Sequence, residues 1–546
     1  MFSAIISVFF FNAVKFGIEL KKKMKSSSPI PIIDLFAGPG GLGEGFSSIT
    51  DKKRNRLFKL VCSIEKEESA YQTLLLRSIF RHFSAGSVPD CYYEYIAGRI
   101  DKKSFLSNKA IQKAFNEATL EARQATLGEI SEKTVNDWIK TAIGASDPWV
   151  LIGGPPCQAY SLAGRSRMRG ADPVAFEADK RHFLYREYLR IIKEFAPAVF
   201  VMENVKGIIS STHGGEKIFN RILGDLKNPG NDLKYKIRSF VYSQDESFGL
   251  PSDFVIKAEN FGIPQKRHRV ILFGVRDDYA NKGHQVLRSS SEKQTVGQMI
   301  DSLPHIRSAI SGANADKSFE QWLSILHSTP QEVLRCDNLM KLSIMDVMEK
   351  ALSRAKKNKG VGGSFIPLKK SPKVNMSEDL KSWILDKRIK GFSLHESRSH
   401  MASDLKRYFF CSSFALALGH SPKLSDFPIG LLPMHQNVKD KNEPFADRFR
   451  VQIEGAPSST VVSHISKDGH YYIHPDPAQC RSLTVREAAR LQTFSDNYFF
   501  EGNRTQQYCQ VGNAVPPYLA KQLAEIVYDF LAKNKKKVRL ISKIDK

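Results

Sequence analysis

The chain has 546 residues, of which 42% are hydrophobic and 25% are charged. This length suits roughly two to four domains, and the composition excludes a largely disordered chain. Lysine and arginine number 81 against 57 aspartates and glutamates, which gives a formal net charge of +24. Such a surplus favours a polyanionic partner, with nucleic acid as the first candidate, although a generally basic soluble protein would carry the same charge.

The seven cysteines include no pair with C-x-x-C spacing. This argues against a zinc ribbon or a redox dithiol, and we expect no metal site. An odd number of cysteines in a long chain does not indicate a disulfide framework. A reducing cytoplasm is therefore the expected compartment.

The N-terminus carries an apolar run, residues 2–14, that is followed by Lys21, Lys22 and Lys23. The run is too short for a membrane span of about 20 residues, and a secretory signal would carry its positive charge ahead of the apolar run. Met24 lies just before the first predicted strand. We therefore expect no membrane partner, and we predict that residues 1–29 are an extension and that translation begins at Met24.

Short apolar runs alternate with helical patterns over the first half of the chain. This alternation predicts an α/β domain with a largely parallel, doubly wound sheet. A long stretch of mostly helical pattern lies between the second and third of these runs, at residues 67–145. The predicted strands are residues 30–36, 60–65, 149–152, 198–202 and 270–275.

The texture changes after about residue 276, where the alternation of strands and helices stops and Ser, Lys, Gly and Pro become frequent. Within this region, residues 353–373 are rich in Lys and Gly and are predicted to form an exposed basic loop. Helical texture returns at Arg481. The predicted divisions are residues 30–276, 277–480, 481–532 and a basic tail at 533–546.

A glycine-rich turn, residues 36–43 (FAGPGGLG), follows the first predicted strand. Glycines let the backbone approach a ligand closely, and the N-terminus of the following helix presents free N–H groups. Glu65 ends the next strand, where an acid can bind a ribose. The pair indicates an adenosine-containing cofactor. The turn by itself also suits NAD, FAD or no ligand, and Glu65 would also suit a solvated loop.

A second motif, residues 153–158 (GGPPCQ), follows another predicted strand. The carboxyl ends of strands are where open α/β sheets bind ligands, and the two prolines fix the backbone just before Cys157. Cysteine is a strong nucleophile once its proton is removed. Cys157 is thus a candidate nucleophile, and the alternative is a buried structural thiol.

Glu203 ends the neighbouring predicted strand and would share a cleft with Cys157. A carboxylic acid beside a thiol suits attack on an electron-poor ring that is protonated on nitrogen as it is attacked. The alternative is a Glu that caps a helix.

Further along, Gln265, Arg267 and Arg269 alternate and would share one face of a strand. They suit phosphate binding, with a solvated edge strand as the alternative. Residues 512–517 (GNAVPP) predict a tight turn followed by a helix.

These segments resemble the DNA cytosine-5 methyltransferase family, and they come in the family's order. The resemblance spans residue 31 to about residue 530. The matching segments are residues 34–41 (DLFAGPGG), 155–158 (PPCQ), 203–205 (ENV), 265–269 (QKRHR), 481–487 (RSLTVRE) and 512–515 (GNAV).

The resemblance implies a Rossmann-like α/β catalytic domain that depends on S-adenosylmethionine, with a smaller target-recognition domain in residues 277–480. The segment 481–532 would return to the catalytic domain. The family's cofactor residues fall on Phe36, Gly38, Gly40, Gly41, Leu42, Glu65, Pro155, Asn513 and Val515.

The resemblance also implies how the reaction proceeds. Cys157 would attack C6 of a flipped-out cytosine, Glu203 would hydrogen-bond N3, and Arg267 would orient the base and its phosphates. Arg269 completes the predicted catalytic set. The expected DNA contacts are Gln158, Ser161, Arg165 and Gln265. The partner would be double-stranded DNA, bound by a monomer, with a restriction endonuclease acting separately in a restriction-modification system.

The chain departs from the family pattern after the third strand. The family places there an acid that contacts the adenine amino group, and the nearest candidate segment has Arg99 at that place, with Asp101 two residues on. In the 277–480 region, the basic loop and the segment His395-x-x-x-Arg398-x-His400 are candidate DNA contacts.

Three alternatives remain open. A catalytically inactive DNA-binding regulator would not need the PPCQ and ENV segments. An RNA-directed enzyme of the same chemistry would not need so large a recognition region. A dinucleotide-dependent oxidoreductase explains the glycine turn and Glu65 but gives no role to Cys157, Glu203 or Arg267.

Overall fold

The computed structural model describes ten stretches of the chain. They are residues 28–84, 86–156, 181–213, 216–243, 250–280, 283–312, 318–334, 341–368, 373–433 and 448–541. The predicted extension up to residue 27 lies outside them, and so do Cys157, Gln158, Ser161 and Arg165.

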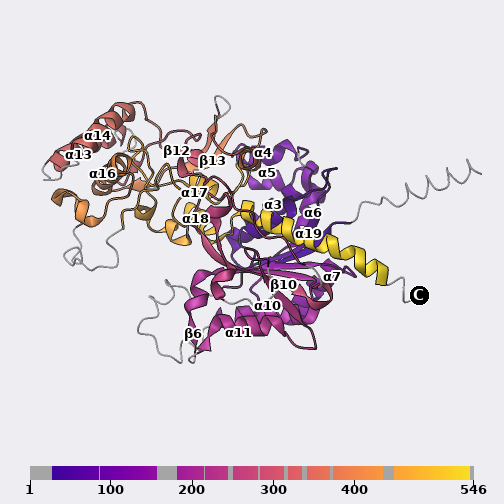
Figure 1. Cartoon of the computed structure of the whole chain (residues 1–546). Coiled ribbons are helices and arrows are strands. Elements are labelled where there is room, and N and C mark those ends of the chain that lie inside the picture. The colour runs from indigo at the N-terminus through magenta and orange to yellow at the C-terminus, as the bar shows by residue number, and fades with distance from the viewer. Residues whose placement is uncertain are drawn as a thin grey trace, which may run out of the picture.

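Figure 1 shows two lobes. We call residues 28–280 with 517–541 the sheet lobe, and residues 296–513 the second lobe.

One mixed sheet forms the centre of the sheet lobe. Its order is β3-β2-β1-β4-β5-β10-β8, with β9 paired to β10. All pairs are parallel except those of β10, which runs antiparallel to β5, β8 and β9. The predicted doubly wound α/β fold is therefore confirmed. The strands are β1 (Ile30–Leu35), β2 (Phe58–Glu65), β3 (Ala122–Gln124), β4 (Val150–Gly153), β5 (Val199–Val205), β8 (Tyr235–Ser239), β9 (Val255–Lys257) and β10 (His268–Arg276).

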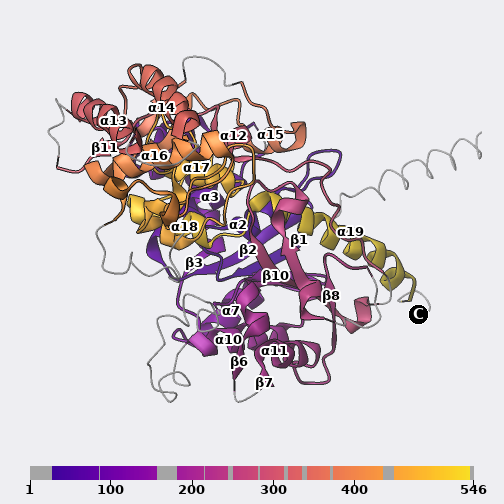
Figure 2. The same ribbon diagram turned by 60° about the vertical axis from the view of Figure 1, so that its left-hand side comes forward.

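Helices cover both faces of this sheet. Successive residues of a strand point to opposite faces, and apolar residues on each face pack against helices. Ile32 and Val201 pack with α2 (Gly41–Ser48) and α19 (Pro517–Ile541). Ile33 and Met202 pack on the other side. The helices of that side are α7 (Glu132–Ile143), α10 (Arg181–Phe195) and α11 (Ile218–Lys227), and Figures 1 and 2 show α10 and α11 across the sheet from α19.

A group of helices lies beside the β3 edge of the sheet, with its own apolar cluster around Leu74 and Tyr92. The predicted helical stretch 67–145 is confirmed, apart from the short strand β3 within it. In Figure 1, α4 and α5 lie next to β12 and β13 of the second lobe. These helices are α3 (Glu68–Arg81), α4 (Asp90–Ile96), α5 (Lys102–Leu106) and α6 (Gln112–Glu121).

The second lobe is mostly helical and contains two apolar clusters, one around Trp322 and Phe409 and one around Ile300 and Tyr498. Its main elements are α12 (Val296–Ile300), α13 (Ser318–Leu334), α14 (Lys341–Ala355), β12 (Gly362–Pro367), α15 (Glu378–Ile384), β13 (Gly391–Glu396), α16 (Ala402–Leu418), α17 (Val485–Leu491) and α18 (Arg504–Asn513). Among the described residues, no helix is both long and apolar enough to cross a membrane.

One sequence prediction for this part of the chain needs correction. Residues 353–373 are not a loop throughout, because α14 continues to Ala355 and β12 pairs with β13. The segment after Arg481 packs in the second lobe through Leu491 and Val511. It also reaches the sheet lobe, where the Tyr498 hydroxyl donates to the Pro39 carbonyl oxygen and where Val515 and α19 pack on the sheet.

Candidate functional site

The carboxyl ends of β1, β2, β4 and β5 meet at one edge of the sheet. In the parallel register, Leu35 of β1 is paired with Ile64 of β2 and with Gly153 of β4, and Gly153 is paired with Met202 of β5. The glycine turn, Glu65, the Gly154–Pro156 segment and Glu203 therefore follow neighbouring strands. Most of the predicted site residues lie at this edge, where an open α/β sheet binds its ligands.

The turn after β1 has a backbone that few side chains tolerate. Phe36, Gly38 and Gly40 all have positive φ, at 57°, 57° and 95°. A Cβ added to Gly38 would meet no atom within 4 Å, so the turn borders open space. Leu42, predicted to touch a cofactor, is 7% exposed and packs in the core against the sheet.

Glu65 holds this turn from the end of β2. The Gly38 N–H donates to Glu65 Oε2 at 2.8 Å, and the Glu67 N–H donates to Oε1 at 2.8 Å. The side chain is not a solvated loop carboxylate, since Glu65 is only 9% exposed and burial raises its pKa. Each oxygen retains a lone pair that could accept a hydroxyl from a ligand.

The C-terminal segment closes on the turn from the other side. A Cβ on Gly41 would lie 2.3 Å from the Val515 carbonyl oxygen, so only glycine permits this approach. Val515 is 7% exposed, while Asn513 is exposed and is the last residue of α18. The predicted tight turn at Gly512 and Asn513 is thus wrong: both residues are helical.

Glu203 lies directly against the segment that leads to Cys157. A Cβ on Gly154 would be 2.9 Å from Glu203 Oε2. The residues that follow Glu203 and Gly154 are also hydrogen-bonded, since Asn204 Nδ2 donates to the Pro155 carbonyl oxygen at 3.2 Å. This contact fixes Pro155 beside β5. The described chain stops at Pro156, and Cys157 is the following residue.

Arg269 is the partner of Glu203. Its Nε lies 2.9 Å from Glu203 Oε1, and each side chain is 14% exposed. The pair is therefore near the surface of the edge, and Glu203 does not cap a helix, since it lies within β5. A carboxylate held on one oxygen by an arginine still has its second oxygen available for a ligand.

Arg267 is placed differently from Arg269. It is 2% exposed and donates to the carbonyl oxygens of Val461 (2.8 Å) and Gly512 (3.2 Å), so it joins the sheet lobe to the second lobe. Burial, followed by the charge of Arg269, lowers the pKa of Arg267 well below its usual range. We expected Arg267 to orient the cytosine. The structure instead gives it a buried position, in which its guanidinium donates to carbonyl oxygens at the junction of the lobes.

Gln265 needs a similar correction as an expected DNA contact. It is fully buried and donates to the Leu491 carbonyl oxygen and to Gln492 Oε1, at 3.2 and 2.9 Å. It also does not share a strand face with Arg269, since β10 begins at His268 and Gln265 forms an isolated bridge with Ser458. Gln265 therefore fixes the junction between the lobes.

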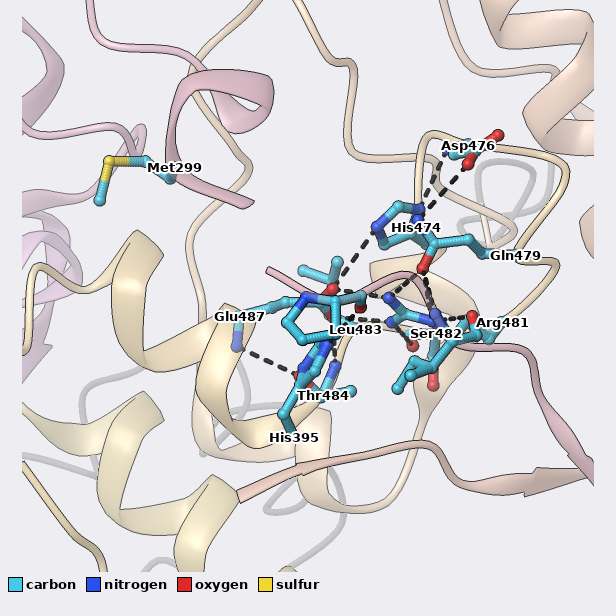
Figure 3. Close-up of polar contacts among 12 residues, drawn as sticks. Met299, His395, His474, Asp476, Gln479, Arg481, Ser482, Leu483, Thr484 and Glu487 are labelled. Atoms are coloured by element: carbon cyan, nitrogen blue, oxygen red, sulfur yellow. Dashed lines mark hydrogen bonds and ion pairs between the residues drawn. The ribbon is translucent and has the colours of Figure 1, made fainter. Parts of the chain in front are cut away.

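The 481–487 motif forms a buried polar network in the second lobe, drawn in Figure 3. Arg481 binds both oxygens of Glu487 at 2.7 Å, and His474 Nε2 lies 3.5 Å from Glu487 Oε1. His395 Nδ1 lies 2.9 Å from the Thr484 hydroxyl, and its Nε2 lies 2.8 Å from the Pro304 carbonyl oxygen.

Burial decides which residues of the His395–His400 segment can reach DNA. His395 is fully buried, and His400 lies between the hydroxyls of Ser308 (2.7 Å) and Ser482 (3.1 Å). Neither histidine is therefore presented to DNA. Arg398 is half-buried and stacks on Tyr508, 4.1 Å from the ring centre. It stays the candidate of this segment.

The acid after the third strand was missed by sequence reasoning. Asp101 caps α5 by accepting from the Ser104 N–H at 2.7 Å, far in sequence from β3. The carboxylate that does follow β3 is Glu129, which is exposed in the turn before α7. The signal that could have found it is the Gly128-Glu129 pair just before an amphipathic helix.

No group of three or more His, Cys, Asp or Glu in the described stretches is arranged to hold a metal ion. The cysteines at positions 62, 91, 411 and 480 are buried and free. Burial raises the pKa of the Cys62 thiol to about 12, which makes it inert as a nucleophile at neutral pH.

Comparison with known proteins agrees with this architecture. The chain is 32% identical over 519 residues to the type II methyltransferase M.Bpa9945I of Bacillus paralicheniformis, covering 92% of this chain and 99% of that protein. It is 27% identical over 420 residues to the DNA (cytosine-5-)-methyltransferase M.ApeKI of Aeropyrum pernix, covering 72% and 83% of the two chains.

Among solved structures, the chain matches a prophage-encoded E. coli protein described as a DNA modification methyltransferase. The TM-score is 0.51 at 17% identity, with 92% of this chain and 99% of that chain covered, which supports the fold. A model of the C-5 cytosine-specific DNA methylase family matches residues 97–528. The chain therefore belongs to the C-5 cytosine-specific DNA methylase family.

Proposed function

We propose that this methylase uses S-adenosylmethionine to methylate C5 of a flipped-out cytosine in duplex DNA, through a covalent bond between Cys157 and C6. The observation that carries the proposal is the contact between Glu203 and the Gly154–Pro156 segment that leads to Cys157. Its relatives named as type II methyltransferases further support a modification role in a restriction-modification system.

The residues at the β1 and β2 ends fit S-adenosylmethionine. The open space beside Gly38, the N–H groups at the start of α2 and the Glu65 carboxylate suit an adenosine with an amino-acid tail. Glu129, the acid that follows β3, is the candidate contact for the adenine amino group. When bound, the cofactor supplies an electrophilic methyl group.

The chemistry on the base then falls to the chain's own side chains. The Cys157 thiolate bonds to C6, and the displaced electron pair moves toward N3, where Glu203 hydrogen-bonds the ring and stabilises the enamine. C5 thereby becomes nucleophilic and accepts the methyl group. Removal of the C5 proton by a base then restores the double bond as Cys157 leaves. Arg269 holds Glu203 in place throughout.

Covalent trapping tests this mechanism. In a duplex made by copying phage DNA with 5-fluorocytosine, C5 carries a fluorine in place of the proton that a base would remove. Cys157 therefore cannot leave after methyl transfer, and the enzyme should remain covalently bound to the DNA. We expect a band stable to denaturing electrophoresis with the parent, none with Cys157→Ala, and none without S-adenosylmethionine. Equal trapping of Cys157→Ala would overturn the mechanism, and trapping on RNA alone would change the substrate class.

A further inference from the structure

A chain of polar contacts begins at the helix that follows the cofactor turn. Glu44 of α2 is 8% exposed and binds Arg77 of α3 with both oxygens, at 2.5 Å from Nη2 and 3.0 Å from Nε. The remaining nitrogen of Arg77, Nη1, donates to Asn497 Oδ1 at 3.0 Å. Because a guanidinium only donates, this contact fixes the Asn497 oxygen toward Arg77.

The other end of the Asn497 amide faces a different part of the molecule. Its Nδ2 donates to Asp386 Oδ2 at 2.7 Å, and the Tyr93 hydroxyl donates to the same oxygen at 2.7 Å. Asp386 follows α15 in the second lobe, and its Oδ1 accepts from the Arg388 N–H at 2.9 Å. A carboxylate only accepts, so the amide orientation is set from both sides.

The residue after Asn497 contacts the cofactor turn itself. The Tyr498 hydroxyl donates to the Pro39 carbonyl oxygen, and the Arg77 guanidinium lies over the Tyr498 ring, 4.8 Å from its centre. The Asn497 carbonyl oxygen accepts from the Tyr92 hydroxyl at 2.9 Å. Residues 497 and 498 thus connect the second lobe, to which they belong, with the turn and with the helices behind it.

The same junction is held by further contacts nearby. Arg388 Nη2 lies 2.5 Å from Asp90 Oδ1 of α4, and the Ser393 hydroxyl of β13 donates to the Ile96 carbonyl oxygen at 2.5 Å. Figure 1 shows α4 beside β13. Asn497 is 8% exposed, and from within the second lobe its amide joins Asp386 of the same lobe to Arg77 behind the cofactor turn.

We propose that Asn497 is a positioning residue that sets the second lobe relative to the cofactor turn, so that DNA held by the second lobe presents its cytosine to the methyl donor. This rests on the proposed function. An amide suits the position because only a group that both accepts and donates can join an arginine to an aspartate. Asn497 itself touches no substrate.

The substitution Asn497→Asp separates the two contacts. The aspartate keeps an oxygen that accepts from Arg77. Its second oxygen replaces the amide nitrogen and faces the Asp386 carboxylate, so a hydrogen bond becomes a repulsion between two acceptors. We expect kcat on unmethylated phage DNA to fall by about 10- to 100-fold, since misplacement of reacting groups by about 1 Å has effects of this size. The Kd for S-adenosylhomocysteine without DNA should stay within about twofold, because an oxygen at position 497 still accepts from Arg77 and the contacts behind the turn are kept.

The double variant Asn497→Asp/Asp386→Asn reverses the polarity of the contact. The amide nitrogen at position 386 can donate to the carboxylate at 497 and to the Tyr93 hydroxyl oxygen, while its oxygen still accepts from the Arg388 N–H, so kcat should recover. Asp386→Asn alone should lower kcat, while the control Asp379→Asn, an exposed carboxylate on α15 just before Asp386, should not. Thermal melts check that each variant is folded at the assay temperature.

The outcomes separate this inference from the proposed function. The positioning role is overturned if the parent methylates DNA and Asn497→Asp is equally active. It is also overturned if the double variant does not recover the activity that Asn497→Asp loses. A parent that neither binds S-adenosylhomocysteine nor methylates cytosine overturns the proposed function instead. Should Asn497→Asp not fold, Asp386→Asn against Asp379→Asn decides the question, since equal kcat values would refute the proposal.

Discussion

The carboxyl edge of the sheet and the core of the second lobe both carry arginine–glutamate pairs, but the pairs differ in burial. At the edge, Arg269 binds one oxygen of Glu203, and each side chain is 14% exposed. In the second lobe, Arg481 binds both oxygens of Glu487, and the two side chains are 0% and 1% exposed. The first pair has an oxygen available for a ligand, whereas the second is used entirely within the fold.

This difference distinguishes a pair that can bind a ligand, Arg269–Glu203, from a pair that stabilises the fold, Arg481–Glu487, although the two look alike in sequence. The Thr484 N–H donates to Glu487 at 2.7 Å, and His474 lies beside it, so every oxygen of Glu487 has protein partners. Burial alone would raise the pKa of Glu487, but the Arg481 guanidinium holds it well below its usual range. The motif around Arg481 therefore stabilises the second lobe, while Glu203 keeps one oxygen available at the sheet edge, as the proposed reaction requires.

Glu203→Gln should have the largest effect on activity. The amide keeps the size of the side chain but cannot supply a proton to N3, so kcat should fall by about 10²- to 10⁴-fold. The free energy of unfolding should change by less than about 1 kcal/mol, as for other partly exposed pairs. Radiolabelled methyl transfer and urea unfolding measure the two quantities. Glu259→Gln, in the neighbouring pair with His268, is the matched control and should keep kcat.

Glu487→Gln should reverse this pattern. It leaves the buried Arg481 charge without its carboxylate, which costs about 3 to 5 kcal/mol of stability when a buried pair loses one member. Methyl transfer per folded molecule should be retained within a few-fold. Urea unfolding with activity normalised to the folded fraction tests this. A variant that stays as stable as the parent but is inactive would place Glu487 in the reaction and remove the distinction between the two pairs.

The second lobe should also lose stability in mild acid because of its buried histidines. Burial lowers the pKa of His395 to about 4, against an ordinary value of about 6.5 in the unfolded chain. The unfolded state therefore takes up a proton that the folded state does not, and stability falls as the pH drops from about 6.5 to about 4. Between pH 7 and pH 5 this amounts to about 2 kcal/mol.

The variant His395→Gln isolates that contribution. Its unfolding free energy should depend on pH less steeply than the parent's by up to about one proton between pH 4 and 6.5. The control is His305→Gln at an exposed position, which should leave the slope unchanged. Unfolding in urea across this pH range gives the slopes. An unchanged slope in His395→Gln would mean that His395 takes up its proton over the same pH range in the folded and the unfolded protein.

The sequence predicted the central strands well because their apolar runs, such as residues 149–152 and 270–275, are long enough to stand out. It missed β3 because the run Ala122–Gln124 contains one apolar residue, Ala122, and two polar ones. As a result, the acid after the third strand was sought near Arg99, whereas the acid that follows β3 in the structure is Glu129. Polar strands at a sheet edge carry too little hydrophobic pattern to be seen.

The site was predicted where a strand end alone determines the geometry, as for Glu203. It was not predicted where a distant segment decides burial. Gln265 and Arg267 were read together with Arg269 as one strand face, yet Ser458 and Val461, nearly 200 residues further on, pair with the first two and bury them. Only the folded chain reveals such long-range partners.

Gly154→Ala should give the smallest effect, and it tests how tightly the edge is built. The new methyl group would lie 2.9 Å from Glu203 Oε2, closer than carbon and oxygen normally approach, so the carboxylate must move while Arg269 holds its other oxygen. We expect kcat to fall about 10-fold, in line with sub-ångström misplacement, with little change in melting temperature. Gly224→Ala, whose Cβ would meet no atom within 4 Å, is the matched control. If Gly154→Ala kept the parent's kcat, the contact between Glu203 and the segment leading to Cys157 would be loose. Catalysis would then not depend on a fixed position of the Glu203 carboxylate.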